Sequence, residues 1–300
     1  MYPSEPPPCP PPAAVLYSAG VAPRLRPVLV LALAALGGRA AHGQTRPLVT
    51  EPAITAPAGT IVFETGFDGM ADEPSYVTGV ERTRWDGPLL RLVFSPAASV
   101  ELDLEWVARV GVRDEEGRGD VASSEPGDVS LRAKWRVVES RGRRPAIGAR
   151  FGVVLPQTSF EDEDFNPLGL GPNTLRAFAE ALLTQPLGPA LLHGNAGLLL
   201  HDEVYRPHDQ RDFFTYGLAL EWPAGGGLAL LAEVAGRAGD GAPGAEARSE
   251  ARAGLRYGRG RVRVDAAARR GLSEADGTWG ATVGLAWDLR ATGAPPRTRP

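Results

Sequence analysis

Two histidines and an asparagine lie close together in a segment of mostly apolar and small residues. His193, Asn195 and His201 are separated by even numbers of positions, so on an extended strand they point to the same face. Such a group could contribute to a metal site, or could supply the base of a hydrolase and its orienting partner. The pattern favours polar side chains satisfied by neighbouring carboxylates, because no serine nucleophile stands at an obvious partner position. His208 carries no spacing signal.

A second candidate is acidic. Glu161, Asp162, Glu163 and Asp164 could bind a divalent cation through oxygen ligands, but they lack the spacing and the glycine of an EF-hand. A solvated charge run is the favoured interpretation. Residues 168–172 superficially resemble a glycine-rich phosphate loop, yet the Lys and the following Ser or Thr are missing, which favours a turn. The sequence thus predicts no catalytic residue, no metal ligand and no cofactor.

The clearest pattern that could position these residues lies in the two halves of residues 99–138. Between Val100 and Val112 the even positions are apolar, and the odd positions include Glu101, Asp103 and Glu105. Between residues 129 and 137 the odd positions are apolar and alternate with polar, mostly charged residues. Because successive side chains of a strand point to opposite faces, each half has one apolar and one charged face. At ~3.3 Å per residue such runs can cross an outer membrane when tilted, which predicts a hairpin of a transmembrane β-barrel.

About twelve strand-like runs follow one another along the chain. The alanine-rich run at 174–184 is also compatible with a helix. The predicted runs are 60–67, 85–94, 100–112, 129–138, 146–155, 174–184, 191–201, 213–222, 228–236, 247–257, 261–269 and 278–289.

The connections separate a barrel from a soluble sandwich, since alternation is common to both. Short turns alternate along the chain with longer polar loops, as in transmembrane barrels that combine short periplasmic turns with long outer loops. We therefore predict an all-β fold, a transmembrane antiparallel up-and-down β-barrel of about twelve strands with both termini in the periplasm. The turns are 95–96, 141–145, 185–189, 223–227 and 258–260, and the loops are 68–83, 113–126, 156–173, 202–212 and 237–246.

The same alternation assigns side chains to the two faces of the wall. Four aromatic residues of outward parity fall near periplasmic strand ends and form the predicted membrane girdle: Trp135, Trp222, Tyr257 and Trp287. Trp106 lies mid-strand and does not fit this girdle. The predicted lumen-lining residues are Glu101, Asp103, Glu105, Arg132, Lys134, Arg136, Arg150, Arg176, Glu180, His193, Glu233, Glu250, Arg252, Arg263 and Asp265.

The first residues indicate export. A basic flank at Arg24 and Arg26, an apolar run at 28–36 and small residues before Gln44 form the pattern of a secretory signal peptide. The single cysteine, Cys9, precedes the predicted cleavage, so the mature chain has no disulfide. We predict a disordered proline-rich start plus signal peptide at 1–43, a periplasmic linker at 44–59, the barrel at 60–289 and a Pro/Arg-rich tail at 290–300.

Three segments resemble a bacterial outer-membrane transporter family associated with the meta-pathway of phenol degradation. They are GDVSLRAKW at 127–135, GVVLP at 152–156 before a polar loop, and the glycine- and leucine-rich residues 191–200. The family commonly has Leu-Pro-Thr-Gly where this chain has Leu155-Pro156-Gln157-Thr158. Such chains usually finish on an aromatic residue recognised during assembly, whereas here Leu289 is followed by the tail. The resemblance implies a barrel and passage of small organic molecules, with no catalytic residues.

Composition narrows the partners. A net charge of −4 and the lack of basic patches interleaved with aromatics argue against nucleic acid. We expect an outer-membrane channel or transporter for passive passage of small molecules, in a Gram-negative bacterium and without enzymatic activity. Its expected partners are the lipid bilayer, lipopolysaccharide, a small-molecule solute and the barrel-assembly machinery. The alternatives are a closed structural or surface-interaction barrel and, less favoured, a barrel hydrolase or a soluble secreted β-sandwich.

Overall fold

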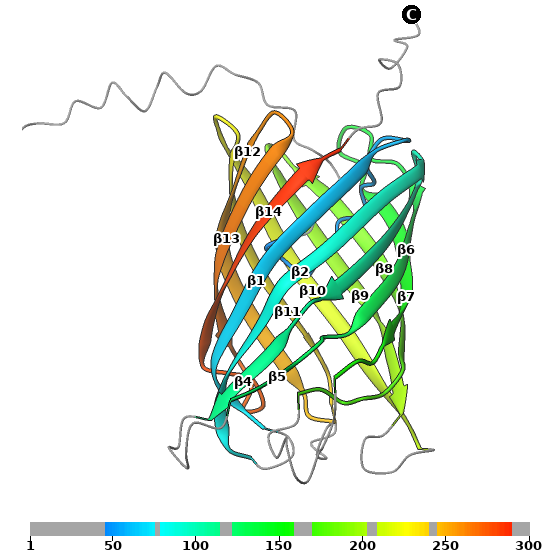
Figure 1. Ribbon diagram of the computed structural model, residues 1–300. Coiled ribbons are helices and arrows are strands. Elements are labelled where there is room, and N and C mark those ends of the chain that lie inside the picture. The colour runs from blue at the N-terminus through cyan, green and yellow to red at the C-terminus, as the bar shows by residue number, and fades with distance from the viewer. Residues whose placement is uncertain are drawn as a thin grey trace, which may run out of the picture.

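The computed structural model describes residues 46–75, 79–114, 122–158, 170–202, 209–239 and 245–289, and every regular element within these ranges is a β-strand. No segment of them forms a helix that is long and apolar enough to cross a membrane. The strands run up and down and close into a barrel (Figure 1). Their bounds are β1 (Ile61–Pro74), β2 (Glu81–Ala97), β3 (Val100–Val107), β4 (Val110–Asp114), β5 (Ala122–Glu125), β6 (Val129–Val138), β7 (Ala146–Leu155), β8 (Arg176–Leu187), β9 (Ala190–Asp202), β10 (Gln210–Gly225), β11 (Leu228–Arg237), β12 (Arg248–Arg259), β13 (Val262–Gly271) and β14 (Trp279–Asp288).

The barrel closes because β1 pairs antiparallel with both β2 and β14. β3 and β4 both pair with β2 and together form one wall strand. β6 pairs with β3, β5 pairs with β4, and together they form the next wall strand. The fourteen segments therefore make a twelve-stranded wall. Closure removes the sheet edges that a sandwich would keep, so the sandwich alternative is wrong.

Most of the predicted strands are confirmed, and β6 and β7 have the predicted bounds. The run at 174–184 falls largely in β8, so the helical alternative is wrong. β8 pairs residue by residue with both β7 and β9, and these ladders override the helix propensity of its alanines.

Short and long connections lie at opposite ends of the barrel, as predicted. The end that carries the short β2–β3, β6–β7, β8–β9, β10–β11 and β12–β13 connections is called the turn end, and the opposite end the loop end (Figure 1). Glycine is required in several of the short turns because the backbone there is left-handed, with φ of 65° at both Gly188 and Gly260.

The outer face of the wall is apolar. On β14 the outward side chains of Trp279, Val283, Leu285 and Trp287 are exposed, whereas the alternate residue Thr282 is buried. Trp279 lies at the loop end and Trp287 near the turn end, which is ~26 Å along the strand at ~3.3 Å per residue and ~20 Å along the axis of a tilted strand. The apolar band is thus close to the thickness of an outer-membrane barrel's lipid-facing belt.

One stretch departs from the predicted alternation. Val110 and Val112 were expected on the apolar outer face, but they are buried and pack against Leu170 from the β7–β8 connection. The inward-facing parity changes across Gly87 and Pro88, since Arg91 and Val93 of β2 are buried at odd positions whereas Arg82 is buried at an even one. The paired strand changes with it while the register of pairing with β2 is kept. Bonds from Gly87 N to the Arg109 carbonyl and from Ala108 N to the Pro88 carbonyl bridge the junction, at 2.8 and 2.9 Å.

Candidate functional site

The residues predicted to line the lumen lie on the inward face of the wall. Most of them meet as ion pairs: Glu101 with Lys134, Asp103 and Glu105 with Arg132, Arg150 with Glu180, and Glu250 with Arg252. Arg136 lies towards the turn end, where it donates to the Ala98 carbonyl, and Arg176 pairs with Asp128 at the loop end. Arg263, Asp265, Glu233 and His193 are buried.

The lumen also holds a segment of the chain itself. Residues 46–60, which precede β1 and are called the inner segment, run inside the barrel (Figure 1). Hydrogen bonds, ion pairs and packing connect this segment to every wall strand. The linker expected at 44–59 therefore contacts the barrel interior wherever the structure describes it.

At one wall, Arg46 occupies a site that we call the Arg46 seat, formed by Asp68, Thr282, the Val283 carbonyl and Asp265. The guanidinium donates to Asp68 at 3.3 Å, to the Thr282 hydroxyl at 2.7 Å and to the Val283 carbonyl at 3.0 Å. Its Nε lies 4.0 Å from the Asp265 carboxylate. β1, β14 and β13 thus share one arginine of the inner segment.

The next residues bind the neighbouring wall mainly through their backbone. Arg256 donates to the Arg46 carbonyl at 2.7 Å, and Arg252 donates to the Pro47 carbonyl at 2.8 Å. The Glu233 carboxylate accepts from the N–H groups of residues 49 and 50, at 3.0 and 2.5 Å. Leu48 packs on small and apolar inward residues, namely Ala219, Ala229 and Leu231.

Glu51 is the central carboxylate of the lumen. It lies 2.8 Å from Lys134 Nζ, 3.1 Å from Arg150 and 3.6 Å from Arg91, and its side chain is 1% exposed. Burial alone would raise the pKa of Glu51, but the positive charges of Lys134, Arg91 and Arg150 outweigh it and hold the pKa well below the ordinary value. With its amide oriented to suit these neighbours, Asn195 accepts from the Glu51 N–H and donates to the Glu51 carbonyl, both at 2.8 Å.

The segment then returns to the turn end. Ala53 N donates to the Thr184 hydroxyl at 2.9 Å, and Ala56 N donates to the Glu101 carboxylate. Gly59 N donates to the carbonyl of Ser95, which lies near the β2–β3 turn, at 2.7 Å. The chain enters β1 from this point.

The histidine candidates do not converge. The His193 Nδ1 lies 3.0 Å from the Thr184 hydroxyl, whereas His201 stacks on Phe213 at 4.9 Å and its Nδ1 lies 2.7 Å from the Asp202 carbonyl. No group of three or more His, Cys, Asp or Glu suited to a metal occurs among the described residues. The acidic residues 161–164, His208, most of the glycine-rich run, the signal peptide and the tail lie outside the described residues.

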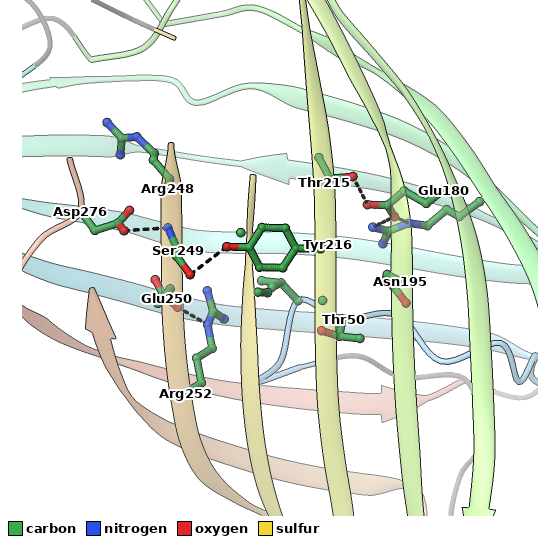
Figure 2. A pocket seen from close by; sticks show the side chains of 15 residues that line it. Thr50, Glu180, Asn195, Thr215, Tyr216, Arg248, Ser249, Glu250, Arg252 and Asp276 are labelled. Atoms are coloured by element: carbon green, nitrogen blue, oxygen red, sulfur yellow. Dashed lines mark hydrogen bonds and ion pairs between the residues drawn. The ribbon is translucent and has the colours of Figure 1, made fainter. Parts of the chain in front are cut away.

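Two cavities lie in the loop half of the lumen. The larger, about 360 Å³, is lined by Thr50 of the inner segment and by charged wall residues that include Glu180 and Arg252 (Figure 2). The smaller, about 230 Å³, reaches Asp68. Both are lined by Arg248, Glu250 and Asp276, so they adjoin. The inner segment forms one boundary of the larger cavity.

The four girdle residues all have exposed side chains. Trp135, Trp222 and Trp287 are about half exposed and Tyr257 slightly less so, and each lies towards the turn end of its strand. Trp85 and Trp279 are also exposed and lie towards the loop end, so aromatic side chains occur near both ends of the outer face.

Sequence reasoning missed the inner segment and the wall residues that serve it, above all Arg46, Glu51, Asp68 and Arg91. The one available signal was Glu51 and Arg46 standing as isolated charges in a proline-spaced, otherwise uncharged stretch. Such charges are equally common in solvated linkers, so the stretch alone does not indicate that it enters a lumen.

Comparison with known proteins supports the fold. Neither models of protein families nor curated protein sequences match this chain. Among solved structures it is similar to an outer membrane channel from Pseudomonas putida F1, with 14% identity over 82% of this chain and 100% of that chain and a TM-score of 0.61. Weaker likenesses are the translocator domain of autotransporter NalP from Neisseria meningitidis (14% identity, 77% and 88% coverage, TM-score 0.44) and outer membrane phospholipase A from Escherichia coli (12% identity, 78% and 98% coverage, TM-score 0.42).

Fold and site together define a class: a closed twelve-stranded antiparallel β-barrel with an apolar outer face, whose charged lumen is crossed by the segment that precedes β1. The similarity to solved structures concerns this fold. The association with phenol degradation stays a prediction.

Proposed function

We propose that this protein is an outer-membrane channel for passive passage of small molecules, and that the inner segment restricts the passage. The observation that carries the proposal is the pair of adjoining charged cavities, the larger of which is bounded by the inner segment. A barrel closed permanently by its own wall would have no need of a separate segment to fill its lumen.

The outer face supports the proposed location in the outer membrane. Large apolar side chains such as Leu218, Leu198 and Phe151 are exposed around the wall, and contiguous apolar surfaces of this size are not left in water. A closed barrel satisfies its backbone groups internally, as a hydrocarbon environment requires. The proposed partners are accordingly the lipid bilayer, lipopolysaccharide, the barrel-assembly machinery and a small-molecule solute.

Restriction of the passage is reversible in this proposal because of how the inner segment is held. Its bonds to the wall are ion pairs and hydrogen bonds that involve side chains, and it joins the ladder only where it continues into β1. Moving it therefore leaves the backbone ladders of the wall intact. Once it moves, selectivity would depend on width and on the mixed charges of the predicted lumen residues.

Single-channel recording tests the proposal. The refolded protein in a planar bilayer should show a low conductance with occasional larger openings, and a variant lacking residues 46–57 should show the larger conductance continuously. A boiling-dependent shift in gel mobility should first establish that both proteins form closed barrels. Absence of current at any voltage from both correctly assembled proteins would count against a channel.

The alternative is a closed structural or surface-interaction barrel. One observation favours it: the inner segment contacts strands all around the wall, which would stabilise a permanently filled lumen. The recording of the wild type separates the two, because a structural barrel whose lumen stays filled would show no openings.

A further inference from the structure

The Arg46 seat is built entirely from wall residues. Asp68 belongs to β1, Thr282 and the Val283 carbonyl to β14, and Asp265 to β13, so the seat remains when the inner segment leaves. The Asp68 carboxylate, the Thr282 hydroxyl and the Val283 carbonyl all accept from the same terminal nitrogen of Arg46, while Nε of the same guanidinium faces the Asp265 carboxylate. The seat therefore contacts two separate nitrogens of one planar cation. A guanidinium has five donors in a rigid plane, whereas an ammonium is a compact charge with three.

The floor of the seat suits a flat group. Gly66 and Gly284 pair with each other across β1 and β14 beneath the Arg46 side chain. A Cβ at Gly284 would lie 2.7 Å from Arg46 Nε, and one at Gly66 would meet the Arg46 guanidinium as well as the Val283 carbonyl. Two adjacent glycines thus leave a slot into which a planar cation fits and from which any other residue would exclude it.

The seat offers more negative charge than Arg46 satisfies. Among the described residues, Asp265 Oδ1 has no hydrogen-bond partner, and neither has either oxygen of Glu64, whose contact with Arg91 is an ion pair at 3.5 Å. Glu64 pairs with Ala286, two positions along β1 and β14 from the glycine pair, so it lies beside the seat. Buried carboxylate oxygens without hydrogen bonds favour the approach of a cation that can donate to them.

The seat is reached from the loop end. Asp68, which holds the Arg46 guanidinium, also lines the smaller cavity of about 230 Å³. A cationic solute entering that cavity meets a carboxylate already placed for a guanidinium. Arg46 then acts as a tethered competitor for the same site.

We propose that the Arg46 seat binds solutes carrying a monosubstituted guanidinium group, which reach it from the loop end and take the place of Arg46. The proposal rests on the channel function above. It names one solute class that the lumen recognises in preference to alkylammonium ions.

The test uses Arg46→Ala, which empties the seat, and methylguanidinium as the probe. Calorimetry on the detergent-solubilised, heat-shift-verified barrel should show methylguanidinium binding to Arg46→Ala at least tenfold more tightly than to the wild type. Methylammonium should bind at least tenfold more weakly than methylguanidinium. Adding Asp68→Asn should abolish the gain, and Arg141→Ala, at an exposed arginine in a turn, should behave as the wild type.

The outcomes distinguish the two proposals, because binding is measured without current. If Arg46→Ala binds methylguanidinium but passes no current, the channel is refuted and the seat stands. If Arg46→Ala passes current but does not bind methylguanidinium, or binds methylammonium equally well, the seat is overturned and the channel stands. If Arg46→Ala does not assemble, Arg46→Lys serves instead, since the single nitrogen of its ammonium cannot lie among these three acceptors and also face Asp265 as the guanidinium does. Failure of Arg46→Lys to bind methylguanidinium more tightly than the wild type would also overturn the seat.

Discussion

Replacing Glu51 by Gln should release the inner segment. The substitution keeps the size of the side chain but removes the carboxylate that faces Lys134, Arg150 and Arg91. Removing one partner of a buried ion pair costs about 3–5 kcal/mol. The cost should fall near the lower limit, because each of the three cations keeps a second carboxylate, as Lys134 does with Glu101. At about 3 kcal/mol the undocked fraction rises roughly 150-fold.

Hydrogen exchange measures this fraction directly. In the docked state the backbone N–H groups of Val49 and Ala53 donate to wall side chains and are protected. In Glu51→Gln their exchange should accelerate by about two orders of magnitude, with longer openings in single-channel recordings. Glu139→Gln, at a half-exposed glutamate near the turn end, is the matched control. Unchanged protection in Glu51→Gln, relative to this control, would refute the assignment of Glu51 as the main electrostatic attachment.

Three further perturbations test the rest of the description. Because the pKa of Glu51 is depressed, its contribution to docking is fully present above the ordinary glutamate pKa of about 4.3 and is lost only as the pH falls below that value. Release of the inner segment between pH 7 and 5 in exchange measurements would contradict this. Gly284→Ala should expel Arg46 by overpacking, at a cost of about 1–3 kcal/mol in docking, whereas Gly194→Ala, whose Cβ would have no atom nearer than 4.0 Å, should leave exchange unchanged. Leu218→Arg, mid-strand on the outer face, should lower the free energy of unfolding of the barrel in lipid vesicles by about 2–4 kcal/mol, measured with denaturant. Val262→Arg, at the turn end, should lower it by about 1 kcal/mol or less. Equal costs would argue against a lipid-facing wall.

Much of the wall follows from local pattern. The alternation of Val129 to Val138 and of Ala146 to Leu155 predicted two strands with the bounds that the structure has. Their inward and outward faces were predictable for the same reason, because a strand alternates its side chains whatever its neighbours are. The order of strands followed from the alternation of short and long connections, which allows each strand to pair with the next.

The sequence by itself thus determined the strands, their faces and the up-and-down closure of this barrel. Only the tertiary structure decided what fills the lumen. Arg46 and Glu51 bind partners far away in sequence, such as Thr282 and Lys134, and no local pattern encodes such contacts. The inward position of Val110, which pairs with Asp86, likewise follows a change of parity that the alternation of residues 100–112 does not show. Periodicity reports the two faces of a strand, whereas the occupant of a closed interior depends on charges that converge there only after the wall has closed.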